Sequence, residues 1–422
     1  MHKLLICTVG GSHEPILRAV EAVQPDFVLF VCSRDDEATG RPGSYIQIVG
    51  KGNIVRAHGD SKPTLPNIPT QIGLEEDRYA HIRVSADDFD SVYSGINDWL
   101  ERNVQKGQEI VADYTGGTKT MSAALVAVAL DRPGIRLQLV TGPRVNLVKV
   151  ESGMEIPLPA GVARTRFRRQ LAQALVPWRR HAYDEAETLL EDIGAPQDPR
   201  LLGEYHRALN LSRAFAAWDR FQHDRAHELL SAHASQVGTA WPSLLGDLSA
   251  MTGDRPAREP LRLFDLWRNA QRRSIQGRYD DAVARLYRLL EWSAQWLLRT
   301  RAGIDTADVP AERVPEHLTL HPNREGRFQA GLYQAWQLAA VHCGQEVNDF
   351  WKSESRHLLD LLKMRNHSIL AHGFAPLGEE EWRRFAQWTE ERLLPLLLDS
   401  SGQAPWRVKK LPAQLPVKML GS

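Results

Sequence analysis

The chain has 422 residues, which is too long for one ordinary core and predicts two or three folded units. Hydrophobic residues make up 43% and charged residues 25%, a balance typical of a soluble globular protein. Lysine plus arginine equals aspartate plus glutamate at 52 each, so no global field draws the protein to nucleic acid or to an anionic membrane. Any contact with RNA therefore has to come from a local patch.

The cysteines and the apolar segments indicate the compartment. Cys7, Cys32 and Cys343 are odd in number and widely spaced, and two of them lie in apolar strand-like runs, which predicts reduced thiols in a core. The N-terminus lacks a basic region followed by a long apolar stretch, and the longest apolar segment, residues 123–130, is far too short to cross a bilayer. We therefore expect a cytoplasmic protein without membrane contact.

The first third of the chain predicts an α/β fold. Strand-like runs at residues 3–9 and 27–33 flank helical apolar spacing at residues 16–23, which is a βαβ unit and implies a parallel sheet. Residues 41–67 are rich in glycine and proline and predict a hairpin and a loop. The elements expected next are a strand at 81–84, a helix from the capping-box-like residues 85–88 to about 104, a strand at 109–114 and an apolar helix at 121–130. Strands at 136–140 and 146–150, joined by a Gly142-Pro143 turn, are predicted to complete the sheet as a hairpin.

Beyond residue 159 strand signals nearly vanish, and the rest predicts an all-α half. Three stretches, at 181–186, 220–226 and 277–282, share a turn that leads into a helix, which suggests weak helical hairpins but no solenoid because their spacing is unequal. Proline-rich breaks at 195–199 and 252–260 mark joints. From about residue 261 the pattern predicts a helical bundle, with helices at 261–277, 279–300, 328–341, 350–372 and 379–398.

A first candidate site is a paired-glycine turn between a strand and a helix. Thr115, Gly116, Gly117, Thr118 and Lys119 combine free helix N-terminal amides, hydroxyls and a cation, which suits a phosphate-bearing ligand. The alternative is a tight turn whose glycines only let the helix pack on the sheet. The sequence fits neither a Walker A loop nor a dinucleotide-binding fingerprint.

A second glycine turn, formed by Thr8, Val9, Gly10, Gly11 and Ser12, ends the first strand. The carboxyl ends of parallel strands share one edge of a sheet, where ligands of open α/β sheets collect. The two turns together predict one anion site that suits nucleotides better than apolar ligands.

A third candidate lies near residue 370. If one helix spans 350–372, Arg365 and His372 fall on the same face because seven residues are close to two helical turns. A neutral histidine can relay a proton to or from a ribose 2′-hydroxyl or a departing 5′-oxygen, arginine can stabilise charge on a phosphorane-like centre, and Asn366 could orient the pair. Such chemistry requires no metal ion, and the sequence contains no convincing ligand cluster. The alternative is a surface arginine and a helix-terminal histidine beside Gly373.

A local basic patch for RNA is also visible in the sequence. It has two interpretations, an RNA contact or an arginine-rich solvated helix face. Its members are Arg164, Arg166, Arg168, Arg169, Arg179 and Arg180.

These residues together resemble a known architecture: an N-terminal CRISPR-associated Rossmann-like (CARF) sensor domain followed by a C-terminal HEPN ribonuclease domain, as in ancillary nucleases of type III CRISPR systems. The signatures are the segment from Asp113 to Lys119 with the Gly10-Gly11 turn, and Arg365-Asn366 followed by His372. The resemblance covers roughly residues 1–155 and 260–400. It implies a CARF-like Rossmann sensor domain at 1–158, a helical connecting segment at 159–258 and a HEPN-like nuclease domain at 259–422.

The resemblance also implies a function. Sensor domains of this family pair across a two-fold axis and bind a cyclic oligoadenylate as allosteric activator, while paired HEPN domains cleave single-stranded RNA at a composite site without a metal cofactor. The implied ligand contacts are Thr8, Gly10, Gly11, Ser12, Thr115, Gly116, Gly117, Thr118 and Lys119, and the implied catalytic residues are Arg365, Asn366 and His372.

Other functions stay open at this point. One is a nucleotide-sensing regulatory or scaffold protein that cuts nothing, and another is a Rossmann-type enzyme acting on a mononucleotide. The sensor could also degrade its own ligand. The ring size of the activator, the base preference and the role of the middle helices are not readable from the sequence.

Overall fold

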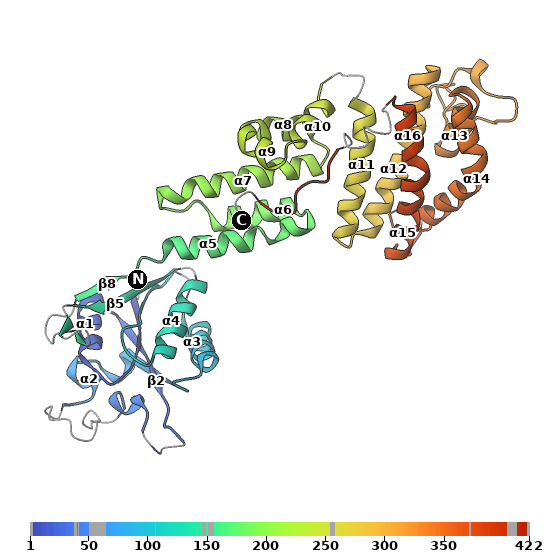
Figure 1. The fold of residues 1–422 in the computed structure, drawn as a ribbon. Coiled ribbons are helices and arrows are strands. Elements are labelled where there is room, and N and C mark those ends of the chain that lie inside the picture. Colours follow the sequence, from blue (N-terminus) through green and yellow to red (C-terminus); the bar gives the residue numbers. More distant parts are fainter. Residues whose placement is uncertain are drawn as a thin grey trace. The chain divides into compact units, whose positions relative to one another are not determined.

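The computed structural model describes residues 3–37, 40, 42–49, 65–105, 107–132, 134–142, 144–145, 149–150, 156–253, 258–370, 373–402 and 412–419. The chain forms two compact units, Met1–Arg169 and Gln170–Ser422 (Figure 1). We describe each unit by itself. The finer domain boundaries at residues 158 and 258 remain predictions.

The first unit is built on a six-stranded sheet of order β3-β2-β1-β4-β5-β8. Five strands are parallel, and β8 is antiparallel to β5. The central strands β1 and β4 pair in a register that sets Cys7 opposite Asp113. The strands are β1 (Lys3–Thr8), β2 (Phe27–Ser33), β3 (Tyr79–Val84), β4 (Glu109–Asp113), β5 (Ile135–Thr141) and β8 (Ile156–Pro159). This confirms the expected Rossmann-like sheet.

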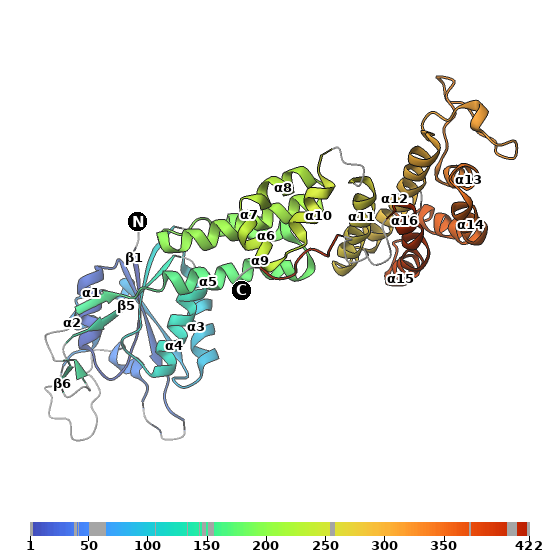
Figure 2. The same cartoon turned by 45° about the horizontal axis from the view of Figure 1, so that its top comes forward.

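Helices cover both faces of this sheet, as Figure 2 shows. Helix α1 (Glu14–Val23) and the short α2 (Ile68–Gln71) pack on one face, and α3 (Phe89–Asn103) and α4 (Lys119–Asp131) pack on the other. Since β1 leads into a helix on one face and the adjacent β4 into a helix on the opposite face, the connections diverge between these two strands. Such a switch point leaves a crevice at the carboxyl ends of the strands.

The predicted hairpin at 136–150 is wrong. Strand β5 pairs with β8, with Leu139 opposite Leu158, whereas β6 (Arg144–Val145) and β7 (Lys149–Val150) form a separate two-stranded sheet. Pro157 and Pro159 in β8 argue against a strand in the sequence. An edge strand nevertheless tolerates prolines, because one side of its backbone makes no hydrogen bonds to a neighbouring strand. The hairpin predicted within 41–67 is also not found in its described part, where residues Ser44–Gln47 form a 3-10 helix; residues 50–64 lie outside the described residues.

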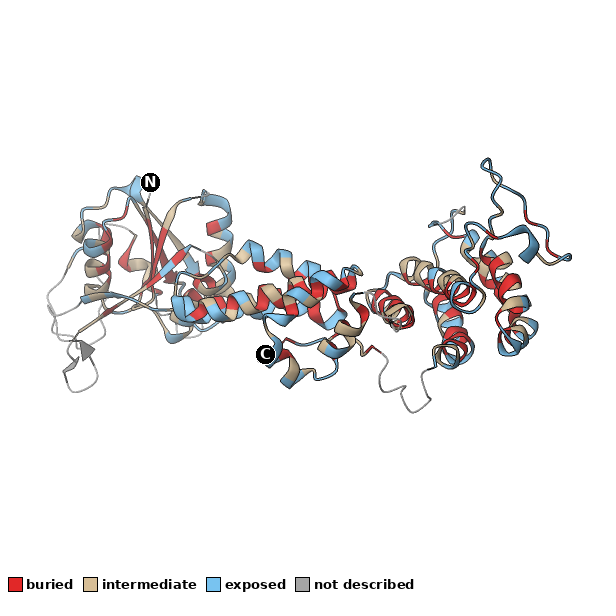
Figure 3. Cartoon of the chain, turned by 90° about the horizontal axis from the view of Figure 1, so that it is seen from above, coloured by how far each residue is buried: buried red, intermediate tan, exposed pale blue. Residues whose placement is uncertain are grey.

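The second unit is helical, as predicted, and its buried residues, red in Figure 3, lie on the facing sides of its helices. Helix α5 (Ala163–Ala174) contains the division between the units. The following helices are α6 (Tyr183–Ile193), α7 (Pro199–Asp219), α8 (His223–Ser231), α9 (Ala234–Ala240), α10 (Leu244–Met251), α11 (Arg258–Ile275), α12 (Tyr279–Leu297), α13 (Leu332–His342), α14 (Gln345–Asn366), α15 (Glu379–Trp388) and α16 (Leu394–Ser400). One continuous apolar core joins α11 to α16 into the predicted bundle.

The three similar stretches of sequence form the same turn. His181, Phe221 and Gly277 each adopt positive φ, at 58°, 63° and 72°, two residues before a helix begins. In each case the next amide bonds the carbonyl five residues earlier, which is the Schellman arrangement that ends a helix. The unit therefore repeats one helix–turn–helix connection at unequal intervals.

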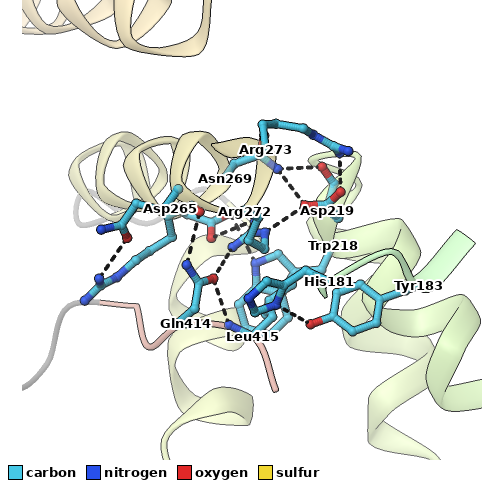
Figure 4. Close-up of polar contacts among 12 residues, drawn as sticks. His181, Tyr183, Trp218, Asp219, Asp265, Asn269, Arg272, Arg273, Gln414 and Leu415 are labelled. Atoms are coloured by element: carbon cyan, nitrogen blue, oxygen red, sulfur yellow. Dashed lines mark hydrogen bonds and ion pairs between the residues drawn. The ribbon is translucent and has the colours of Figure 1, made fainter. Parts of the chain in front are cut away.

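Residues 412–419, which we name the strap, lie against the helices of this unit (Figure 4). Arg268 donates to the Pro412 carbonyl at 3.1 Å, Arg272 to Gln414 Oε1 at 3.0 Å, and the Tyr183 hydroxyl to the Pro416 carbonyl at 2.7 Å. Leu415 is buried. The strap thus connects α6 to α11 through side chains that are far apart in the sequence.

A buried ionic cluster lies behind the strap (Figure 4). The fully buried Arg272 donates through Nε to Asp219 at 2.7 Å, and Trp218 donates to Asp265 at 3.1 Å. His223 Nε2 lies 2.8 Å from Asp265 Oδ2. These contacts join α7, α8 and α11, so we assign the cluster a structural role.

Candidate functional sites

The two predicted glycine turns come together at the switch point of the sheet. The Thr8 hydroxyl donates to the Gly116 carbonyl at 2.7 Å across the ends of β1 and β4. A Cβ placed on Gly10 would lie 2.6 Å from the Gly117 amide nitrogen, and one on Gly116 would overlap the Thr8 carbonyl. Glycine is therefore required here for close approach of two backbones. Gly11, in contrast, has no described neighbour within 4 Å of its Cβ position.

The turn formed by Thr115 to Lys119 is held in place by several side-chain hydrogen bonds. The Thr118 hydroxyl caps α4 by accepting from the Met121 amide at 3.2 Å and donates to the Ala86 carbonyl at 2.6 Å. Thr115 Oγ1 accepts from the Val140 amide at 2.7 Å. These bonds fix the conformation in which Gly117 has φ of +77°.

The Asp113 carboxylate, at the end of β4, accepts hydrogen bonds that hold this turn in place, a role that the sequence did not predict. Its Oδ1 accepts from the Thr115 amide at 3.0 Å and its Oδ2 from Gln138 at 3.2 Å. The carboxyl group is buried, and this desolvation raises its pKa, while the bonds from Thr115 and Gln138 act in the opposite direction. Its position at the last residue of a buried strand was the signal that could have found it.

Several donors at the crevice have no partner among the residues that the structure describes. The amides of Gly10, Gly11, Gly116 and Gly117 make no hydrogen bond to another described residue. Backbone amides at the start of a helix favour an anion, and Lys119, the exposed first residue of α4, adds a positive charge.

The predicted ligand contacts thus fall into two groups. The hydroxyls of Thr8, Thr115 and Thr118 are engaged in holding the turns, whereas Ser12 and Lys119 have no side-chain partner among the described residues. Direct contact of any of the nine residues with a ligand stays a prediction.

Three arginines of the run at residues 164–180 make contacts with described residues. Arg166 donates to the carbonyls of Ala129 and Ile135 at 2.6 and 2.7 Å, and Arg169 pairs with Asp131 at 2.7 Å. Arg180 pairs with Glu185. These arginines stabilise the packing of neighbouring elements, which favours the structural interpretation of the run.

The helix carrying Arg365 ends earlier than predicted. Helix α14 ends at Asn366, not at 372, so the argument that places Arg365 and His372 on one helical face does not apply. His367 caps the helix, and the amide of Ser368 bonds the Arg365 carbonyl at 2.9 Å. Ala371 and His372 lie outside the described residues.

Backbone hydrogen bonds join the residues on either side of Ala371 and His372. The Gly373 amide bonds the Ser368 carbonyl, and the Ile369 amide bonds the Ala375 carbonyl, both at 3.1 Å. A Cβ on Gly373 would overlap the His367 carbonyl, so the chain passes close to the helix end. The chain therefore folds back onto the end of α14 within a few residues of Arg365.

Arg365 itself is half-buried and rests on an aromatic ring. Its guanidinium carbon lies 4.4 Å from the centroid of Tyr287 on α12, and its Nη1 donates to Asn366 Oδ1 at 3.3 Å. The nearby apolar side chains Ile369, Leu370 and Phe374 are exposed at 58%, 51% and 95%. Contiguous exposed apolar side chains of this kind are typical of an interaction surface.

Two further properties of the described residues concern metal binding and membrane contact. No three of their histidine, cysteine, aspartate or glutamate side chains come together in a way that could hold a metal ion. None of their helices combines the length and the apolar character needed to cross a membrane. The three cysteines are unpaired and buried, as the sequence predicted.

Comparison with known proteins bears on both units. Residues 252–393 match the family model described as the Csm6 HEPN domain. The solved structure of Enterococcus italicus Csm6 bound to cyclic hexa-2′-fluoro-hexa-dAMP is similar over 97% of each chain, with 12% sequence identity and a TM-score of 0.54. Can2 from Sulfobacillus thermosulfidooxidans in complex with cyclic tetra-adenylate covers 57% of this chain and 69% of its own, at 11% identity and a TM-score of 0.24. No curated protein sequence matches the chain. The resemblance to the CARF–HEPN architecture, inferred from the sequence, is confirmed.

Proposed function

We propose that this CARF–HEPN protein is a cyclic-oligoadenylate-activated, metal-independent endoribonuclease that cleaves single-stranded RNA in type III CRISPR defence. The observation that carries the proposal is the junction of the two glycine turns at the sheet switch point, in a chain whose residues 252–393 match a HEPN domain. The fold neighbour described as bound to a cyclic hexanucleotide analogue supports this ligand class.

The sensor site fits a phosphodiester ligand chemically. Amides of Gly10, Gly11, Gly116 and Gly117 offer donors without side-chain bulk, and Lys119 supplies a charge at the same helix N-terminus. A cyclic oligonucleotide with two-fold symmetry would bridge two copies of this crevice in a homodimer.

At the nuclease site, Arg365 and His372 have separate tasks. His372 takes the proton from the ribose 2′-hydroxyl, whose oxygen attacks the adjacent phosphorus, and delivers that proton to the 5′-oxygen as it departs. Arg365 stabilises the negative charge that develops on the phosphoryl oxygens, and Asn366 orients the guanidinium through its Oδ1. The products are a 2′,3′-cyclic phosphate, or the 3′-phosphate that follows its hydrolysis, and a 5′-hydroxyl.

The exposed side chains of Ile369, Leu370 and Phe374 favour a composite site. They flank the Arg365 helix end and would be covered if two HEPN domains pair there. Each protomer then contributes one set of Arg365, Asn366 and His372.

The test uses labelled single-stranded RNA in EDTA with the full-length protein, alone and with cyclic tetra-adenylate or cyclic hexa-adenylate. We expect cleavage only with an activator, loss of that cleavage in His372→Ala and Arg365→Ala, and ends that carry 2′,3′-cyclic phosphate. Tight binding of the activator without cleavage by the wild-type protein would instead identify a regulatory or scaffold protein. Mass spectrometry of ligand retained after co-expression with a type III effector identifies the ring size.

A further inference from the structure

We propose that Tyr287 is a positioning residue for the nuclease reaction, and that its ring holds the Arg365 guanidinium in the orientation required by the scissile phosphate. This inference rests on the proposed function. It adds a residue from α12 to a site that the sequence motif places only at the end of α14.

The contact between the two side chains has the geometry of a cation–π pair. The guanidinium carbon lies 4.4 Å from the ring centroid, within the range in which the ring quadrupole attracts a cation. A planar guanidinium that rests on a ring keeps the N–H donors at its edge available, and these are the groups that bind a phosphate. The ring therefore holds Arg365 without consuming its hydrogen-bonding capacity.

Arg365 differs in this respect from three other arginines of the same bundle, which pair with carboxylates. Arg288 pairs with Glu291, Arg299 with Glu259, and Arg301 with Glu346. No described carboxylate lies within ion-pair distance of Arg365. A carboxylate partner would neutralise the charge that a phosphorane-like centre needs, whereas an aromatic ring leaves that charge intact.

The platform under Arg365 is rigid. Tyr287 is half-buried and packs against the bundle core, and its helix neighbours Leu286 and Leu290 are fully buried. Arginine has a long, flexible side chain, so fixing it before the substrate arrives reduces the entropy lost when the phosphate binds. Burial raises the pKa of the Tyr287 phenol, so the ring stays neutral near pH 7 and does not itself act as the base.

The test compares single-turnover cleavage by four variants with that of the wild type, in EDTA with saturating activator. Tyr287→Leu and Tyr287→Met remove the ring, and Tyr287→Phe keeps it. Tyr333→Leu is the matched control, because Tyr333 is a half-buried tyrosine of the same bundle that contacts Trp351 and not Arg365.

We expect the ring-free variants to lower the cleavage rate constant on the order of tenfold while the half-saturating RNA concentration changes less than about threefold. Tyr287→Phe and Tyr333→Leu should stay within about twofold of the wild type. Thermal unfolding shows which variants fold, and the methionine variant replaces the leucine variant if that one does not.

Two results would overturn the inference alone: wild-type rates in the folded ring-free variants, or a Tyr287→Phe variant as slow as them, since the hydroxyl would then be the active group. Failure of the wild-type protein to cleave RNA with either activator overturns the proposed function, and this inference with it.

Discussion

Gly10 and Gly117 meet through their backbones, since a Cβ on the first would lie 2.6 Å from the amide nitrogen of the second. The turns after β1 and β4 are consequently one structural unit, and any side chain between them pushes the strand ends apart. The neighbouring Gly11 has no atom of the described residues within 4 Å of its own Cβ position.

This difference predicts opposite outcomes for two adjacent alanine substitutions. Gly10→Ala should destabilise the first unit by about 1–3 kcal/mol and weaken activator binding, because the added methyl group overpacks the junction. Gly11→Ala should leave the free energy of unfolding within about 0.5 kcal/mol of the wild type. Urea unfolding and calorimetric titration with cyclic oligoadenylates measure both quantities. Equal effects of the two substitutions would contradict the close-approach role of Gly10.

Lys119 offers a second prediction at the same crevice. Lys119→Gln should reduce activator affinity on the order of tenfold at low salt, with a smaller difference at high salt, because a charge-assisted contact to phosphate is lost. The melting temperature should not change, since the side chain is exposed and has no partner among the described residues. Arg102→Gln, an exposed cation on α3, is the control and should bind the activator normally.

Phe374 provides a test of the composite nuclease site. Phe374→Asp should weaken homodimerisation and lower RNA cleavage at least about tenfold, because a charge enters an apolar interface. Stability of the protomer should not fall, since 95% of the side chain is exposed. Analytical ultracentrifugation measures the dimer, and Ile275→Asp, at an apolar residue 52% exposed on α11, serves as the control. A Phe374→Asp protein that dimerises and cleaves like the wild type would remove this surface from the interface.

His181 makes the stability of the helical unit depend on pH. Burial and the charge of Arg272 lower its pKa to about 4, and Nδ1 lies 3.0 Å from the Tyr183 hydroxyl. That hydroxyl donates its only proton to Pro416, so Nδ1 must be the donor between the two. Below pH 6.5 His181 takes up a proton in the unfolded chain but stays neutral in the folded protein. As the pH falls from 6.5 to 5, this difference in proton uptake lowers the free energy of unfolding by about 2 kcal/mol.

The measurement is urea unfolding at pH 7 and pH 5, followed by tryptophan fluorescence. His181→Asn keeps a residue that tolerates positive φ but cannot titrate, so its stability should vary less over this interval. An unchanged difference between the two pH values would show that His181 does not control the acid sensitivity.

The sequence was most informative where local pattern and burial coincide. The buried runs that form β1 and β4 and the glycine pairs that follow them are local, and parallel pairing brings their ends to one edge. The pairing of β8 with β5 was missed because Pro157 reads as a break, although an edge position accepts it. His181 and Phe221 end helices at positions where glycine is the usual signal, so only their repetition in the sequence indicated the turn.

The end of α14 near Arg365 was less predictable for a different reason. The residues after Asn366 favour a helix, so the sequence predicts that the helix continues to residue 372. In the structure, the turn closed by Ser368, Gly373 and Ala375 ends it at Asn366. The contact between Arg365 and Tyr287 joins residues 78 positions apart on different helices, and no local pattern encodes such a pair.

The strap has a consequence for biosynthesis. Its contacts reach back 144 residues to Arg268, 166 to Asp247 and 233 to Tyr183. Helices α6, α10 and α11 leave the ribosome well before the segment that joins them. The helical unit therefore gains this connection only after residues 412–419 have been synthesised.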